Sequence, residues 1–281
     1  AEQLKSSVSC TVRLNELMSG HTSFKIGGPA DILVLPESIE QLREVLKVVK
    51  ETVVPLTLLG NGSNVLVRDK GIRGIVIKLG NMLRHFYEAE DLLVFGSGYS
   101  LALASYKAME CGRTGMEFAV GIPGSIGGAV YMNAGAYDGE MQNIVNCVKV
   151  MDLQGNERVL TAEELNFGYR KTSLQNSGLI VTEVTLKMPS GNKDEIKSKM
   201  DDFSHRRISK QPLEMPSAGS MFKRPPGYFA GTLIDQAGLK GYTVGGAQIS
   251  TKHAGFVVNV GGATAADVLQ LIKDVQTKIK A

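Results

Sequence analysis

Two segments in the second half of the chain combine a cationic side chain with residues that favour a ligand site. Arg170 lies within residues 167–172, where two aromatic residues and a glycine indicate partial burial of its guanidinium. A partly buried guanidinium requires a carboxylate or phosphate partner. Ser220 lies within residues 217–225, the densest mixture of small, hydroxyl-bearing and cationic residues in this half. Each segment suits an anionic ligand, although a surface arginine and a turn serine are the ordinary alternatives.

Two glycine-rich segments predict the walls of a cofactor site. Residues 121–128 place four glycines in eight positions and are followed by Asn133–Ala136, while residues 60–64 have the sequence Gly-Asn-Gly-Ser-Asn. A backbone without side chains allows a ligand to approach closely. Successive N–H groups, helped by the Ser63 hydroxyl and the Asn64 amide, can form a nest for phosphates. Each segment alone is explained better by a tight connection, but the pair favours a cofactor site.

Several familiar sites are excluded. A Rossmann fingerprint requires a helix after the glycines, whereas residues 60–64 precede Val65–Val67, which resembles a strand. The chain contains neither a Gly-Lys-Ser/Thr sequence nor a Gly-x-Ser-x-Gly elbow. The four histidines lie far apart and the three cysteines lack metal-ligand spacing, so no metal site is predicted.

The elements that must carry these segments follow from hydrophobic periodicity and capping signals. Helices are predicted over residues 38–50, 100–110, 192–209 and 228–239 and from residue 264 onwards. Strands are predicted over residues 31–35, 53–59, 65–67, 72–79, 92–96, 145–153, 158–160, 179–188, 246–249 and 256–260. Residues 1–20 are predicted to form a helical or loose arm.

Composition sets the broad class. A length of 281 residues suggests two or three domains, and 43% hydrophobic and 21% charged residues are typical of a globular protein. A formal charge of +3 is too small to indicate a nucleic-acid partner. No apolar run has the length of a membrane span, and scattered cysteines fit a reducing cytosol, so we expect no membrane association.

Taken together, these motifs resemble those of the MurB family, the UDP-N-acetylenolpyruvoylglucosamine reductases. The matching segments follow one another in family order. They are residues 21–31, 60–66, 121–128, 133–137, 169–170, 217–225 and 252–256. Segments 121–128 and 217–225 are the most specific. No insertion resembling the extra tyrosine-bearing loop follows residues 256–260, which suggests the shorter, type II subtype.

The resemblance implies an α+β fold with an FAD-binding region of the p-cresol methylhydroxylase type and a C-terminal α+β substrate-binding domain. It implies FAD-binding subdomains over residues 1–80 and 81–190 and the substrate domain over residues 191–281. The implied FAD-binding residues are Gly60, Asn61, Gly62, Ser63, Asn64, Val65, Leu66, Pro123, Gly124, Ser125, Gly127, Gly128, Gly135 and Ala136.

The implied reaction has two halves. NADPH gives a hydride to flavin N5, and the reduced flavin passes it to the enolpyruvyl methylene of UDP-N-acetylglucosamine enolpyruvate, in peptidoglycan precursor synthesis. Arg170 resembles the arginine that stabilises the resulting enolate-like carbanion, and Ser220 resembles the serine that protonates it. The implied substrate contacts are Tyr137, Tyr169, Lys223, Arg224 and His253. The expected partners are therefore this UDP-sugar and NADPH, in a bacterial cytoplasm, with a monomer favoured.

One family feature is missing. The family carries a third catalytic group, a glutamate near its C-terminus, and no glutamate follows Glu214. Because the chain starts at Ala1 without methionine and stops at Ala281 within a predicted helix, we expect a trimmed sequence with that glutamate beyond it. Two alternatives remain open. They are another flavin oxidoreductase of the same superfamily and a catalytically inactive nucleotide-binding homologue.

Overall fold

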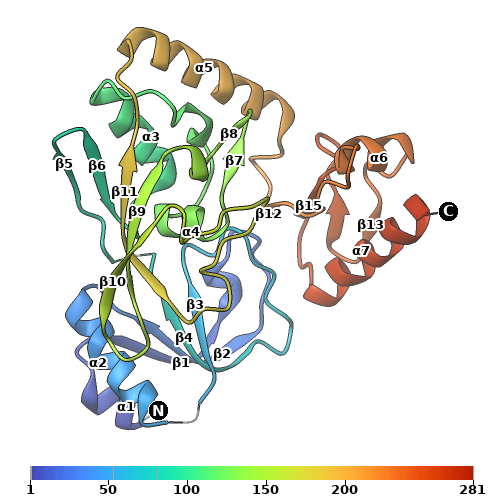
Figure 1. The fold of residues 1–281 in the computed structure, drawn as a ribbon. Coiled ribbons are helices and arrows are strands. Elements are labelled where there is room, and N and C mark those ends of the chain that lie inside the picture. The colour runs from blue at the N-terminus through green and yellow to red at the C-terminus, as the bar shows by residue number, and fades with distance from the viewer. Residues whose placement is uncertain (1, 53, 81, 281) are drawn as a thin grey trace. The chain divides into compact units, whose positions relative to one another are not determined.

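The computed structural model describes residues 2–52, 54–80 and 82–280 (Figure 1). Its helices are α1 (Glu2–Ser7), η1 (Met18–His21), α2 (Ile39–Lys50), α3 (Leu101–Glu110), η2 (Glu117–Ala119), α4 (Ile126–Tyr131), η3 (Met141–Asn143), α5 (Lys193–Lys210), α6 (Ala230–Gln236) and α7 (Ala265–Lys280). Its strands are β1 (Thr11–Leu17), β2 (Pro29–Leu35), β3 (Leu56–Leu59), β4 (Ile72–Lys78), β5 (Phe86–Ala89), β6 (Leu92–Gly96), β7 (Gly135–Ala136), β8 (Gly139–Glu140), β9 (Val145–Met151), β10 (Glu157–Thr161), β11 (Ile180–Lys187), β12 (Ser217–Ser220), β13 (Thr243–Val244), β14 (Ala247–Ile249) and β15 (Phe256–Asn259).

The chain forms two compact units, each assembled from three segments. Unit 1 comprises Ala1–Arg13, Leu33–Asn61 and Ile75–His205, and unit 2 comprises Leu14–Ile32, Gly62–Gly74 and Arg206–Ala281. One four-stranded sheet has the order β1-β2-β4-β3, with β3 and β4 parallel. The predicted boundaries after residues 80 and 190 stay predictions.

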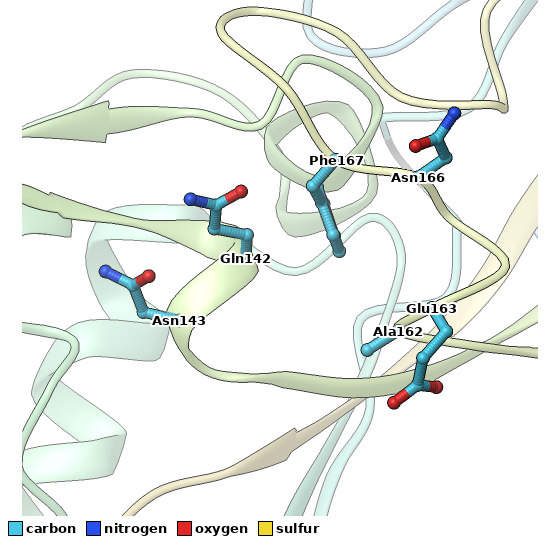
Figure 2. Close-up of a pocket in the computed structure, with 6 residues that line it drawn as sticks. All are labelled: Gln142, Asn143, Ala162, Glu163, Asn166 and Phe167. Atoms are coloured by element: carbon cyan, nitrogen blue, oxygen red, sulfur yellow. The ribbon is translucent and has the colours of Figure 1, made fainter.

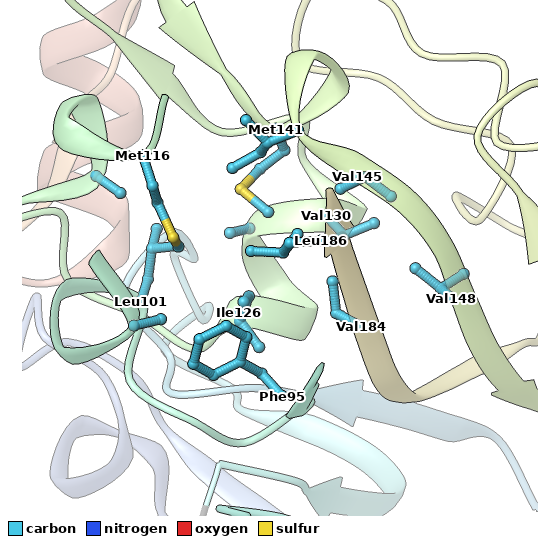
Figure 3. Close-up of a cluster of buried hydrophobic side chains, with 14 of the residues drawn as sticks. Phe95, Leu101, Met116, Ile126, Val130, Met141, Val145, Val148, Val184 and Leu186 are labelled. Carbon is cyan, nitrogen blue, oxygen red and sulfur yellow. The ribbon is translucent and has the colours of Figure 1, made fainter. Parts of the chain in front are cut away.

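The core of unit 1 lies on an antiparallel sheet of order β10-β9-β11-β6-β5. The short helix α4 packs on β6 and β11. Figure 3 shows its Ile126 and Val130 among Phe95 of β6 and Val184 and Leu186 of β11, all buried. Burying such side chains stabilises by roughly 1.5–3 kcal/mol each. The start of α4 is therefore held firmly against the end of β6.

Side chains at the predicted helix starts 38, 100 and 192 cap three helices of unit 1. The Ser38 hydroxyl accepts a hydrogen bond from the Gln41 N–H at 3.2 Å, and the Ser100 hydroxyl accepts one from the Leu103 N–H at 3.4 Å. The Asn192 side-chain oxygen accepts from the Asp194 N–H at 2.8 Å at the start of α5. These side chains satisfy N–H groups that a helix leaves unpaired at its beginning.

Unit 2 is built on a sheet of order β12-β15-β14-β13, with α7 packed against β13 and β14. Its core contains Val257 of β15 and Val268 and Leu271 of α7. The Asp69 carboxylate accepts hydrogen bonds from the first N–H groups of α7, at 2.7 and 3.0 Å. A negative charge at a helix N-terminus is favourable, so this contact fixes where α7 begins.

Three sequence predictions about local structure are wrong. The N-terminal arm contains the strand β1, and Ser217–Ser220 forms β12 where no strand was predicted. Val65–Val67 is not a strand, because Leu66 and Val67 pack their side chains inward without pairing to a neighbouring strand. Tertiary packing outweighs the β-propensity of valine and leucine here. No helix follows the glycines either, so the exclusion of a Rossmann loop holds.

Candidate active site

The two glycine-rich segments meet within unit 1. A Cβ atom placed on Gly60 would lie 3.3 Å from the hydroxyl oxygen of Ser125. That hydroxyl caps α4 by accepting a hydrogen bond from the Gly128 N–H at 3.3 Å. Gly60 follows β3 directly, and Ser125 precedes α4 directly. The structure therefore brings the end of one strand to the start of one helix, with glycines on both sides.

Unpaired backbone N–H groups are available where these segments meet. The N–H groups of Asn61, Gly124 and Ser125 donate no hydrogen bond to any part of the chain that the structure describes. Buried or partly buried N–H groups normally find a partner. Unsatisfied donors at a helix start favour a phosphate or another anion. The donor set therefore fits the pyrophosphate of a dinucleotide cofactor.

Other predicted cofactor glycines have packing reasons of their own. A Cβ atom on Gly127 would lie 2.8 Å from the Cβ of Ser97, where α4 packs on the end of β6. Gly62 adopts a φ of +71°, and a Cβ atom there would lie 2.2 Å from the His21 carbonyl oxygen. Gly135 pairs with Glu140 between β7 and β8. Close contacts within the protein require these three glycines, whether or not a ligand touches them.

The limit between the two units falls within the predicted cofactor-binding segment 60–66. Gly60 and Asn61 belong to unit 1, and the residues that follow belong to unit 2. In unit 2 these are Gly62, Ser63, Asn64, Val65 and Leu66. Pro123 and Ala136 lie in unit 1, in the loop before α4 and in β7.

Arg170 is held by main-chain carbonyl groups. Its guanidinium donates to the Asn133 carbonyl at 3.0 Å and to the Gly135 carbonyl at 2.8 Å. Its own backbone has a φ of +55°, in a tight turn closed by two hydrogen bonds between Gly168 and Lys171, at 2.9 and 3.0 Å. The turn and the two carbonyls fix the guanidinium beside β7, which carries predicted flavin-lining residues.

The charge of Arg170 has no counter-ion. No carboxylate of the described residues lies within the 4.0 Å that defines an ion pair with this half-buried side chain. The centroid of the neighbouring Tyr169 ring lies 5.3 Å from the guanidinium carbon. A half-buried cation without a counter-ion is well suited to bind an anionic ligand. The predicted requirement for an anionic partner is therefore not met from within the described chain.

Ser220 and His253 lie together in unit 2. Ser220 ends β12, is exposed, and donates from its hydroxyl to the Gly255 carbonyl at 3.4 Å. His253 Nδ1 accepts a hydrogen bond from the Gly255 N–H at 3.1 Å. Burial lowers the pKa of His253 below its usual value. Because Nδ1 accepts this hydrogen bond, the neutral imidazole carries its proton on Nε2.

The remaining predicted substrate residues differ in their surroundings. Lys223 is exposed and contacts no polar partner among the described residues. The Arg224 guanidinium carbon lies 4.2 Å from the centroid of the Phe229 ring. Tyr137 stacks on Phe203 of α5 at 4.4 Å, and its hydroxyl donates to the Phe203 carbonyl at 3.3 Å. The packing of Tyr137 on α5 is sufficient to explain its position.

A separate pocket in unit 1 does not suit an anion. Figure 2 shows its lining side chains, which offer amides and one carboxylate but no cation. They are Gln142, Asn143, Ala162, Glu163, Asn166 and Phe167. None of them is a predicted site residue.

The role of Asn133 was not predicted from the sequence. This asparagine is fully buried, and its side chain makes hydrogen bonds to three segments of unit 1. Its φ of +42° is a left-handed conformation that asparagine tolerates. Asparagine just before a glycine-containing turn was the available signal. Its partners Glu140 and Gln142 lie 7 and 9 residues away and Gly168 lies 35 residues away, and none of these spacings follows a helix or strand pattern.

Known proteins with similar sequence or fold identify the class of protein to which the chain belongs. Residues 30–161 match the family model described as an FAD binding domain. A variant of Physcomitrella patens BBE-like 1 shares the fold with a TM-score of 0.50, at 15% identity over 67% of this chain and 44% of that one. The fold and the site thus define an FAD-binding α+β protein with an additional C-terminal unit.

The family follows from closer matches. Residues 211–281 match the C-terminal domain of UDP-N-acetylenolpyruvoylglucosamine reductase. The reductases of Clostridioides difficile strain 630 and Clostridium perfringens strain SM101 are 49% and 52% identical, over 96% of this chain and 89% and 88% of theirs. The Thermus caldophilus MurB crystal structure matches with a TM-score of 0.82, at 40% identity over 95% of this chain and 94% of that one.

The chain belongs to the UDP-N-acetylenolpyruvoylglucosamine reductase family. The predicted family, fold class, enzyme class and FAD cofactor are confirmed. Within the described ranges no helix is long and apolar enough to cross a membrane. The same ranges contain no group of three or more His, Cys, Asp or Glu side chains that could hold a metal ion.

Gly60→Ala is expected to weaken FAD binding about tenfold or more. The added methyl group would lie 3.3 Å from the Ser125 hydroxyl and shift this wall beside the N–H groups that suit the pyrophosphate, and losing one hydrogen bond to a charged group costs about 1.5–3 kcal/mol. Titration of the apoprotein with FAD, followed by flavin fluorescence, measures the effect. Gly20→Ala is the matched control, because a Cβ atom there meets nothing within 4 Å. Equal FAD affinity in both variants would show that residue 60 does not border the cofactor.

Proposed function

We propose that the protein reduces UDP-N-acetylglucosamine enolpyruvate to UDP-N-acetylmuramate, with FAD as cofactor and NADPH as reductant, in peptidoglycan precursor synthesis. The observation that carries this proposal is the state of Arg170. Its half-buried guanidinium is fixed by two main-chain carbonyls beside β7 and lacks a carboxylate partner among the described residues. An enolpyruvyl substrate supplies the missing anion through its own carboxylate.

The unpaired N–H groups of Asn61, Gly124 and Ser125 support a dinucleotide as the resident cofactor. FAD, when bound, supplies two-electron hydride transfer. In the proposal, the N–H groups hold its pyrophosphate, and the predicted residues of segments 60–66, 123–128 and 135–136 border the rest. Because Gly60 and Ser125 approach each other closely, bulky side chains are excluded from this wall.

Arg170 acts on the charge that forms during reduction. Adding a hydride to the enolpyruvyl methylene leaves negative charge on the neighbouring carbon, which is conjugated with the carboxylate. A fixed guanidinium stabilises this charge without having to reorganise, because its two carbonyl contacts already hold it. Reduced mobility of the side chain is therefore part of its proposed role.

Ser220 completes the reaction in the proposal by donating its hydroxyl proton to that carbon. A serine hydroxyl is a weak acid, so it serves only a strongly basic carbon. The hydroxyl is exposed and makes one long hydrogen bond of 3.4 Å, which leaves it able to turn towards a ligand. Lys223 and Arg224, close in sequence, supply positive charge for the developing alkoxide.

Several finer assignments are also proposals. We assign Tyr137, Tyr169, Lys223, Arg224 and His253 to substrate binding on the family resemblance. We place the protein in the bacterial cytoplasm as a monomer, since the relatives named above are bacterial enzymes acting on small molecules. The boundaries after residues 80 and 190 are proposed as limits of the FAD-binding subdomains and the substrate domain.

A turnover assay tests the proposed function. The purified protein is expected to show flavin absorbance and to oxidise more than one NADPH per flavin only when UDP-N-acetylglucosamine enolpyruvate is present. Product analysis should find UDP-N-acetylmuramate in equal amount to the NADPH consumed. A protein without flavin would contradict the enzyme assignment. Repeated NADPH turnover that does not depend on this substrate would instead favour another flavin oxidoreductase.

A further inference from the structure

We propose that Asn133 is a positioning residue that keeps Arg170 available to an anionic ligand by holding Glu140 away from it. The inference deepens the proposed function and rests on it, because it assigns the support of the proposed anion-stabilising group. It concerns contacts within unit 1 alone, between the segment 131–136 and the loop 168–175, here called the arginine loop.

The Asn133 side chain contacts both the arginine loop and Glu140. Its Nδ2 group donates to the Glu140 carboxylate at 3.1 Å and to the Gly168 carbonyl at 3.1 Å. Its Oδ1 atom accepts from the Gln142 N–H at 3.0 Å. One buried amide thus joins the arginine loop to β8 and to the segment after it. A fully buried amide with all these contacts satisfied costs little, whereas its removal leaves several polar groups unpaired.

Glu140 is the carboxylate that Arg170 would otherwise meet. It pairs with Gly135 across β7 and β8, and the Gly135 carbonyl accepts a hydrogen bond from Arg170 at 2.8 Å. Its two oxygens are engaged instead by Asn133 and by the Gln142 side chain. No ion pair links Glu140 to Arg170 in the ranges that the structure describes. The neighbouring amides therefore occupy a carboxylate that could neutralise the guanidinium.

Further hydrogen bonds fix the arginine loop to the segment 131–136. The Thr172 hydroxyl, 1% exposed, donates to the Tyr131 carbonyl at 2.9 Å. The Gln175 amide donates to the Tyr131 carbonyl at 3.2 Å and to the Arg170 carbonyl at 3.1 Å. These bonds restrain the loop backbone. Only Asn133 contacts both the loop and Glu140 within the described residues, so the separation of the two charges depends on it.

Asn133→Gly is the direct test, because glycine accepts the left-handed backbone that Asn133 adopts. We expect hydride transfer to the sugar substrate to slow about 10- to 100-fold, as for a misplaced catalytic group, while reduction by NADPH keeps its rate. Adding Glu140→Gln should restore most of the lost rate, because it removes the carboxylate that neutralises Arg170. Asn166→Gly is the matched control, since Asn166 is exposed, lies outside the arginine loop and has a similar left-handed φ of +43°.

A crystal structure of the Asn133→Gly variant supplies a readout that does not need activity. We expect Glu140 to move within ion-pair distance of Arg170. If Arg170 keeps both carbonyl contacts and Glu140 stays apart from it, the inference is overturned. Equal slowing of both half-reactions, or no rescue by Glu140→Gln, would also overturn it.

If the glycine variant does not fold, Asn133→Asp replaces it as the test. Aspartate keeps the backbone preference and removes the donor, and the same results would support or overturn the inference. A wild-type protein that fails to turn over would refute the proposed function, and the crystal structure would still decide the role of Asn133.

Discussion

Ser220→Ala is expected to leave the rate of flavin reduction by NADPH unchanged and to slow the substrate half-reaction by about 10²–10⁴-fold, the usual contribution of a general acid. The hydroxyl is exposed at the end of β12 and makes one long hydrogen bond within unit 2. Its removal should therefore disturb the fold little. Anaerobic stopped-flow absorbance separates the two half-reactions.

The control for this variant is Ser209→Ala, because the Ser209 hydroxyl donates to the Arg206 carbonyl of its own helix, α5. It should match the wild type in both half-reactions. A Ser220→Ala protein that loses both half-reactions equally would refute the proton-donor role. Such a result would assign Ser220 to binding or to structure instead.

Arg170→Met is expected to slow the substrate half-reaction by about 10²–10³-fold, the typical loss when a preorganised electrostatic contact is removed. Arg170→Lys should recover only part of the rate. Lysine retains the charge, but its single nitrogen replaces the two guanidinium nitrogens that separately contact the Asn133 and Gly135 carbonyls. Substrate affinity should fall together with the rate, because the substrate carboxylate loses its partner.

Arg158→Met is the matched control, since Arg158 is an exposed arginine on β10. Far-UV circular dichroism and thermal melting should show that all three variants are folded. If Arg170→Met turns over like the wild type, the guanidinium is a structural tether of the segment 131–136 and not a catalytic group.

Local signals predicted much of the framework of this fold. The caps at Ser38 and Ser100 and the alternating apolar residues of β9 and β11 are decided within a few residues of the chain. The strands β1, β5 and β12 were missed. Strands β5 and β12 have only four residues each, and such short strands are stabilised by their partners. Ser217–Ser220, for example, pairs with β15, which lies about 40 residues further along the chain.

The candidate site also combines features that the sequence predicted with features that only the folded structure shows. Residue type alone indicated Arg170, Ser220 and the glycine segments. The structure adds what sequence spacing cannot contain, such as the approach of Gly60 to Ser125 and the three contacts of the buried Asn133 side chain. It also gives some predicted glycines a packing role, as at Gly127. Tertiary contacts determine these features, and even the shortest of them, from Asn133 to Glu140 and Gln142, follow no helix or strand spacing.

The most direct test of the central claim uses the natural full-length protein with its flavin reduced and oxygen excluded. The reduced protein is mixed with UDP-N-acetylglucosamine enolpyruvate, and flavin absorbance is followed while the sugar nucleotide is analysed by mass spectrometry. We predict that the oxidised spectrum returns and that one UDP-N-acetylmuramate forms for each flavin reoxidised. A flavin that stays reduced, with the enolpyruvyl substrate recovered intact, would contradict the account.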